Sequence, residues 1–97
     1  MEFEYDPSKS ESNRRKHGVD FEEAQALWDG PVLSATTYAG NDDERTLTIG
    51  AIGGKCWTAI TTMRGGRIRI ISVRRSRDYE EEAYRGRIEG RDRGGDR

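Results

Sequence analysis

Two pairs of adjacent glycines constrain the fold of this chain more than any other feature. Gly53-Gly54 and Gly65-Gly66 each stand between two runs in which apolar and polar residues alternate. Glycine adopts positive φ without steric cost, and two such residues in succession suit the tight turn of a β-hairpin. The segments around them, 45–52, 55–63 and 67–74, are therefore expected to form an antiparallel meander.

The stretch before this meander predicts two helices. Asp6 followed by Pro7 is typical of a helix start, and Gly18 of a helix end. Asp20 and Glu23 have the spacing of a capping box, which indicates that a second helix begins there. Its core face is expected to carry the apolar residues that follow at helical spacing. These are Phe21, Ala24, Leu27 and Trp28.

The first of these helices has an unusual composition. Residues 8–17 contain no large apolar side chain, so packing of an apolar face cannot stabilise this helix. Two interpretations remain open. The helix is weak and solvated, or its last residues Asn13, Lys16 and His17 are held against a charged group.

The order of the expected elements predicts an α+β fold. A short extended segment at 2–5 comes first, and 32–38 is a possible fourth strand. We expect a small antiparallel sheet of three to four strands, packed with two N-terminal helices and one C-terminal helix. Ser76 is expected to begin the C-terminal helix, in which Glu80 and Tyr84 share one face.

The chain length and composition indicate one domain. Residues 1–85 are expected to form it, whereas residues 86–97 form a charged, Gly- and Arg-rich tail that is expected to be disordered. With one cysteine, Cys56, and one histidine, His17, the chain offers neither an internal disulfide nor a Cys/His zinc site. We therefore expect no metal and no cofactor.

No apolar run is long enough to span a bilayer, and the start does not resemble a signal peptide. We expect a cytoplasmic protein without membrane contact.

Charge is distributed unevenly along the chain. The formal net charge of −1 argues against a strong polyanion binder. Yet residues 1–30 hold eight acidic residues against four Lys and Arg, while 64–77 hold six arginines and no acid. This distribution predicts a molecule with an acidic and a basic side.

Three stretches of the sequence resemble the BrnT toxin family. The first comprises Asp6-Pro7-Ser8-Lys9, Asn13, Lys16-His17-Gly18-Val19 and Phe21-Glu22-Glu23-Ala24. The second is Glu44-Arg45 followed by Leu47-Thr48-Ile49-Gly50. The third is Arg67-Ile68-Arg69-Ile70-Ile71-Ser72-Val73-Arg74, with Glu80 and Tyr84 after it. The resemblance extends over residues 3–85 and keeps the order and spacing of all three stretches.

This resemblance implies a type II toxin with a RelE-like fold. Such a toxin is a metal-independent endoribonuclease that cleaves cellular RNA and inhibits growth. A BrnA-type antitoxin neutralises it in a hetero-oligomer, and the pair reaches DNA only indirectly, through the antitoxin. A second interpretation is a catalytically degenerate module that binds its antitoxin and contributes to transcriptional autoregulation. The acidic balance and the single histidine, His17, motivate that alternative.

Metal-free RNA cleavage requires a base, an acid and cations that stabilise the phosphorane-like transition state. The candidate catalytic residues are His17, Arg69, Arg74 and Tyr84. The candidate RNA-binding residues are Lys16, Arg45, Arg64, Arg67 and Arg75. His17 could instead cap a helix end, and Tyr84 could anchor the C-terminal helix.

The arginines have an alternative role as well. Arg67 and Arg69 could form a surface ladder with acidic residues, for which the candidates are Asp42, Asp43 and Glu44. In a regular strand Arg69 and Arg74 lie on opposite faces, whereas a β-bulge near Ser72 would place them on one face. The sequence leaves both questions open.

Overall fold

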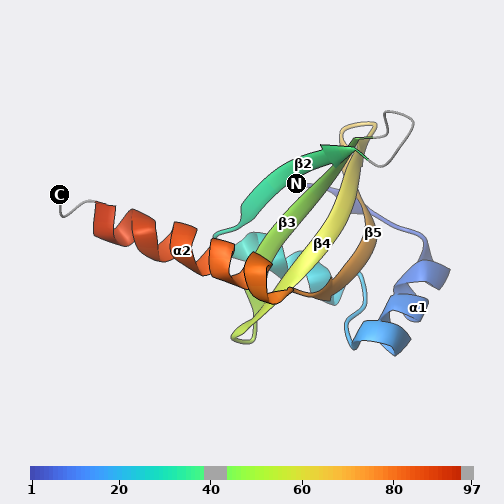
Figure 1. Cartoon of the computed structure of the whole chain (residues 1–97). Helices are drawn as coiled ribbons and strands as arrows, with labels where there is room; N and C mark the ends of the chain where they lie inside the picture. The colour runs from blue at the N-terminus through green and yellow to red at the C-terminus, as the bar shows by residue number, and fades with distance from the viewer. Residues whose placement is uncertain (39–43, 95–97) are drawn as a thin grey trace.

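A five-stranded sheet forms the centre of the protein, with its strands in the order β1-β5-β4-β3-β2. The computed structural model describes residues 1–38 and 44–94, and the side chains of 1–38 and 44–88. Along the chain the elements are β1 (Phe3–Glu4), α1 (Pro7–His17), the 3-10 helix η1 (Glu23–Asp29), β2 (Leu33–Tyr38), β3 (Glu44–Ile52), β4 (Lys55–Arg64), β5 (Arg67–Arg75) and α2 (Asp78–Gly94). Figure 1 shows η1 behind the sheet, α2 in front of it and α1 beside β5. The α+β class is confirmed.

The two glycine pairs form the hairpin turns that the sequence predicts. All four glycines have positive φ, 58° and 81° in the first pair and 59° and 82° in the second. Strands β2 to β5 pair antiparallel, each with its neighbour in sequence. The predicted meander is therefore confirmed, and β2 is its fourth strand.

The sheet differs from the prediction at its other edge. Phe3 and Glu4 of β1 pair in parallel with Ile68 and Arg69 of β5. The sheet therefore has five strands and is mixed, so the prediction of three to four antiparallel strands was wrong on both points. A strand of two residues has no alternation to detect, and its partner lies more than sixty positions away in the sequence.

Strand β5 contains an irregularity that decides where its side chains point. Ile60 of β4 pairs with Ser72, but the next residue, Thr61, pairs with Ile70. Ile71 is therefore an extra residue in β5, as in a β-bulge. The bulge reverses the alternation of side chains, so that the residues on its two sides share one face of the sheet. These are Arg67, Arg69, Ser72 and Arg74.

The main core lies on the η1 side of the sheet. Its fully buried members on the helical side are Phe21, Ala24 and Leu27, each three residues after the last. Ala24 and Leu27 lie one turn apart in η1, because a 3-10 helix has three residues per turn, and Phe21 stands in the turn before η1. The capping box that precedes η1 is formed, with Glu23 N–H donating to the Asp20 carboxylate at 2.7 Å and Asp20 N–H to Glu23 at 3.0 Å.

Helix α2 packs on the opposite side, which we call the α2 face. Its first residue is Asp78, two positions later than predicted. The Ser76 hydroxyl lies 2.9 Å from the hydroxyl of Thr58 on β4, and Arg77 N–H donates to the Glu80 carboxylate at 2.8 Å. Ser76 thus ties the connection to β4 instead of capping the helix.

Helix α2 continues to Gly94, well into the segment predicted as a tail. Residues 95–97 lie outside the described residues, and the domain boundary at residue 85 stays a prediction. None of the described helices has the length and apolar composition needed to cross a membrane.

Candidate functional site

Polar side chains attach α1 to the sheet. The helix begins as predicted, with the Asp6 carboxylate accepting a hydrogen bond from Ser8 N–H at 2.8 Å. It is capped at its other end by Gly18, whose φ is 88°. The two buried side chains of α1 are Ser10 and Asn13, both polar. The hydroxyl of Ser10 accepts from Phe21 N–H at 2.9 Å. Helix α1 can therefore pack against the rest of the protein without an apolar face.

Asn13 makes the central contact of this attachment. Its amide nitrogen donates to the carbonyls of Val73 and Val19 at 2.9 and 2.8 Å, and its amide oxygen accepts from Val73 N–H at 3.2 Å. The pairing between β1 and β5 ends at Arg69, so Asn13 satisfies backbone groups of β5 beyond that point. The sequence left two interpretations of α1, a weak solvated helix and a helix held against a charged group. Neither describes this attachment, because Asn13 is buried against neutral backbone groups.

A groove of about 310 Å³ lies between α1 and the bulge of β5. The α1–β5 groove is lined by Lys9, Ser12, Asn13, Lys16, His17, Ile71 and Ser72. The residues from α1 recur at three- and four-residue spacing and therefore occupy one helix face. The bulge supplies the other wall, since Ile71 is its extra residue and Ser72 follows it.

The groove is cationic. Lys9, Lys16 and His17 are exposed, and within the described part of the chain none of them forms an ion pair. The backbone of Gly18, whose N–H donates to the Arg14 carbonyl at 2.8 Å, closes the helix end. In the same part of the chain no hydrogen bond to the His17 side chain is formed that would assign it to capping.

The arginines of β5 lie close to acidic residues instead. Arg67 pairs with Glu2 at 3.1 Å, and Arg69 with Glu4 at 3.0 Å. The parallel pairing of β1 brings these acids beside β5, so the expected separation into an acidic and a basic side is wrong here. The predicted surface ladder of arginines and acids therefore exists, but its acids are Glu2 and Glu4. Two of the acids predicted for it, Asp42 and Asp43, lie outside the described residues.

Arg74 is bound more tightly than the other arginines. Its guanidinium donates to both carboxylate oxygens of Glu80, at 2.8 and 2.9 Å. The buried Glu80 carboxylate also accepts from the Thr58 hydroxyl at 3.1 Å and from Arg77 N–H. Hydrogen bonds from Arg74 are the largest cause that lowers the pKa of Glu80, from 4.5 to about 2. The pair joins β5 to α2 on the α2 face.

Tyr84 shares the buried face of α2 with Glu80, as the sequence predicts. Its hydroxyl donates to the carbonyl of Pro31 at 3.0 Å, and its ring packs with Ile49 and Cys56. This contact is the anchoring role that the sequence left as an alternative to acid catalysis.

The remaining RNA-binding candidates are spread over the sheet. Arg75 lies with its guanidinium 5.5 Å from the ring centre of Trp57, and its Nε donates to the Cys56 carbonyl. By the strand register both side chains are on the η1 side, away from Arg69. Arg64 is exposed beside the hairpin turn, and Arg45 lies on β3, half-buried.

The structure therefore brings together only part of the predicted set. Lys16 and His17 share the groove, and the bulge puts Arg69 on the same face as Ser72, which lines it. Lys9 and Ser12 were missed, although their spacing from Lys16 on a helix without apolar residues indicates a polar face. Ser72 could not be found, because its orientation depends on the bulge.

Among the described residues, no group of three or more His, Cys, Asp or Glu side chains is placed to hold a metal ion.

A family model described as the ribonuclease toxin BrnT of type II toxin–antitoxin systems matches residues 5–80. The chain belongs to this family. The matched region of the BrnT toxin includes α1, η1 and strands β2 to β5, and it ends at Glu80 before Tyr84. A type II toxin family implies an antitoxin as partner. No match to the chain was found among curated proteins.

Proposed function

We propose that this BrnT toxin is a metal-independent endoribonuclease that cleaves cellular RNA in the cytoplasm and thereby inhibits growth. One observation carries the proposal. Two cationic side chains, those of Lys9 and Lys16, lie with His17 in the α1–β5 groove without an ion pair to the described residues. A BrnA-type antitoxin neutralises the toxin in a hetero-oligomer and carries the contact to DNA.

The absence of ion pairs in this groove, within the described residues, favours it as the phosphate site over three of the four arginines of β5. A cation that already pairs with a carboxylate must lose that partner before it binds a phosphate. Arg67, Arg69 and Arg74 all have such partners, at 3.1 Å or less. Lys9 and Lys16 are exposed and can meet a phosphate directly.

The chemistry follows from these positions. A base removes the proton of the RNA 2′-hydroxyl, the 2′-oxygen attacks phosphorus, and the bond to the 5′-oxygen breaks as that oxygen takes up a proton. The products are a 2′,3′-cyclic phosphate and a 5′-hydroxyl. We assign proton transfer to His17, because histidine exchanges protons near neutral pH. Lys16 and Lys9 hold the charged phosphate oxygens.

The other candidates take different roles in this proposal. Arg69 pairs with Glu4 and joins β5 to β1 beside the groove, so it is not one of the cations that bind the phosphate. Arg74 and Tyr84 hold α2 in place through Glu80 and Pro31.

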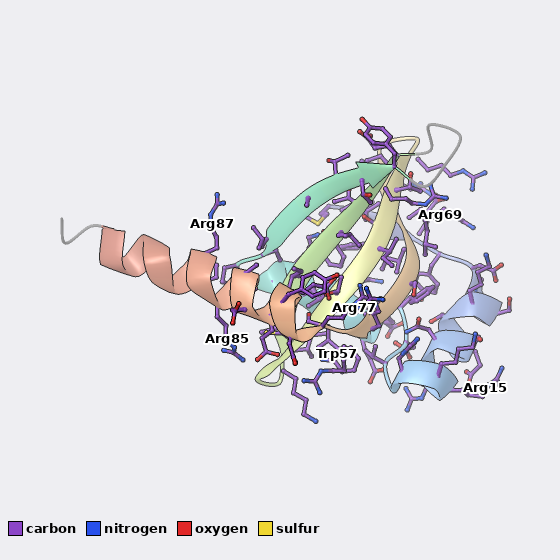
Figure 2. All side chains as sticks on the ribbon, in the orientation of Figure 1. Arg15, Trp57, Arg69, Arg77, Arg85 and Arg87 are labelled. Atoms are coloured by element: carbon purple, nitrogen blue, oxygen red, sulfur yellow. The ribbon has the colours of Figure 1, made fainter. Side chains whose placement is uncertain are left out.

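Cleavage of labelled RNA in the presence of EDTA tests the proposal, with product ends identified by mass spectrometry. We expect His17→Ala to lower the rate about 100-fold and Lys16→Ala about tenfold, the range for a positioned proton-transfer group and a single charge contact. The matched control is Arg15→Ala, which removes a cation from the same helix but outside the groove lining. Figure 2 shows Arg15 at the outer side of α1, and this variant should cleave at the wild-type rate.

Cleavage that EDTA abolishes and magnesium restores would contradict metal independence. Equal rates for His17→Ala and Arg15→Ala would remove the groove from the mechanism.

The pairing of the β5 arginines also favours a second candidate function. A toxin whose arginines are bound by carboxylates could keep the fold and the antitoxin-binding surface without catalysis. It would act only in antitoxin binding and in transcriptional autoregulation. Wild-type protein that leaves RNA intact at low salt, yet binds its antitoxin, would establish this alternative.

A further inference from the structure

The edge of the sheet formed by β2 is unusually open. Strand β2 (Leu33–Tyr38) pairs with β3 on one side, and within the described residues no strand lies on its other side. Five of its six residues are exposed. Edge strands are commonly protected by charged side chains, proline or a bulge, because their free N–H and C=O groups can pair with another chain. The sequence of β2 contains no charge and no proline.

An apolar groove of about 230 Å³ lies beside this edge on the α2 face. It is lined by Leu33 and Ala35 of β2, Leu47 and Ile49 of β3, and Tyr79, Glu80 and Ala83 of α2. The Glu80 carboxylate is paired with Arg74. Tyr79 stands at its mouth and is 64% exposed. Figure 1 shows that α2 crosses in front of the sheet and continues outward past β2. A strand added to β2 would therefore lie beside this projecting helix.

Cations flank the edge at both ends. Arg45 lies opposite Thr37 in the register and shares the face of Leu47. At the other end Ile88 of α2 packs in the same cluster as Leu33, and Arg87 precedes it. Figure 2 shows Arg87 rising from α2 on the outer side of β2. Neither arginine pairs with a carboxylate within the described residues.

We propose that the β2 edge binds an extended segment of the antitoxin, which adds to the sheet as a further strand. Backbone hydrogen bonds to β2 supply affinity, and every second side chain of the segment is apolar and enters the groove beside Leu33 and Ala35. Acidic side chains of the segment meet Arg45 and Arg87, which set its position. The inference rests on the proposed function only in naming the antitoxin as the occupant.

This surface is separate from the proposed RNA site. The α1–β5 groove lies at the β5 side of the sheet, with β4 and β3 between it and β2. Binding at β2 holds the antitoxin on the toxin without filling the cationic groove. A peptide that occupies only the β2 edge should therefore leave RNA cleavage unchanged.

A synthetic probe tests the proposal on the full chain. The probe is a capped, fluorescein-labelled peptide, Glu-Thr-Val-Thr-Val-Thr-Glu, whose valines and terminal glutamates lie on one face of a strand, and the measurement is fluorescence anisotropy without RNA. We expect saturable binding to the wild type and at least about tenfold weaker binding to Ala35→Lys, since an inward-pointing charge on an edge strand opposes pairing there. The matched control is Thr36→Lys, which adds the same charge to the opposite face of β2 and should bind as the wild type does.

Further variants test the role of the charges and provide a replacement if Ala35→Lys does not fold. The same peptide with lysine in place of both glutamates should not bind, and Arg45→Glu with Arg87→Glu should weaken binding of the acidic peptide. If Ala35→Lys lowers the melting temperature, Tyr79→Ala replaces it, because Tyr79 is exposed and borders the groove.

No saturable binding, or equal binding to Ala35→Lys and Thr36→Lys, would overturn the proposal. So would a dimer of the chain alone in sedimentation that Ala35→Lys dissociates, because the occupant would then be a second copy. Failure of the ribonuclease proposal appears in the RNA assay and leaves the peptide measurement unaffected.

Discussion

Helices α1 and α2 are both attached to the sheet by buried polar groups, but the groups differ in charge. Asn13 of α1 binds the neutral backbone of Val73, whereas Glu80 of α2 binds the guanidinium of Arg74. A neutral attachment needs no counterion, and Lys9 and Lys16 of α1 remain without an ion pair to the described residues. The attachment of α2 instead occupies the guanidinium of Arg74.

This difference shows where charge is structural and where it is available for binding. The Arg-rich strand β5 is the most basic segment of the sequence, yet three of its four arginines pair with Glu2, Glu4 and Glu80. The less conspicuous lysines of α1 line a groove without such partners. A count of basic residues along a sequence therefore does not locate a phosphate-binding surface.

The largest effect is expected at the attachment of α2. Glu80→Ala removes the acceptor of two Arg74 hydrogen bonds and leaves that guanidinium unpaired in a site where its side chain is 19% exposed. Breaking one partner of such a pair should lower the free energy of unfolding by about 4 kcal/mol. Urea denaturation followed by circular dichroism measures it. A loss no larger than that of an exposed-site variant such as Glu82→Ala would show that the pair does not hold α2.

The next largest effect is expected in the pH dependence of the unfolding free energy, to which the charged attachment of α2 contributes and the neutral attachment of α1 does not. The folded-state pKa of Glu80 is about 2, below its ordinary value of 4.5. Between these values the unfolded chain binds more protons than the folded chain, so stability from this group is complete above pH 4.5 and is lost toward pH 2. The loss should approach about 3 kcal/mol in the wild type.

Glu80→Gln provides the control for this series, because every other carboxyl group is retained. Its unfolding free energy should change less than that of the wild type over the same range. Parallel curves for the two proteins would disprove the assignment to Glu80.

Asn13→Ala tests the neutral attachment of α1. It removes three hydrogen bonds and leaves the N–H and C=O of Val73 without their partner, which should cost about 2 kcal/mol because water can partly replace the amide at the sheet edge. The pH dependence of stability should stay that of the wild type. Hydrogen exchange of the Val73 amide reports the site directly, and an unchanged exchange rate would refute the docking role.

The smallest effect is expected for Tyr84→Phe. The substitution removes only the hydrogen bond to the Pro31 carbonyl and should lower the free energy of unfolding by about 1 kcal/mol. RNA cleavage should remain at the wild-type rate, since Tyr84 belongs to the α2 attachment. A large fall in cleavage with unchanged stability would return Tyr84 to the list of catalytic groups.

Local chemistry made much of the fold predictable from sequence. The glycine pairs, the Asp6-Pro7 helix start and the Asp20 capping box each fix the backbone through neighbouring residues, and all three are present. The common face of Glu80 and Tyr84 follows from helix periodicity alone. Features that need only a few adjacent residues can be read without knowledge of the fold.

The remaining features depend on contacts across the chain. Pairing of Glu4 with Arg69 and of Asn13 with Val73 joins residues sixty or more positions apart, and no local pattern marks either. The sequence of β5 carries no signal for the bulge at Ile71. Its effect on the direction of the side chains is visible only in the strand register. The candidate site combines these features, which explains why only Lys16 and His17 of its groove were predicted.

The extra residue in β5 also decides which changes of length the sheet tolerates. Deleting Ile71 would leave every other side chain of β5 on its present face, because Ile70 and Ser72 already pair with consecutive residues of β4, Thr61 and Ile60. Only the α1–β5 groove would change, since it would lose one wall residue. In an evolving lineage the core should therefore tolerate loss of this one codon, whereas a deletion in the middle of β4, which has no extra residue, would turn half of that strand's side chains to the opposite face.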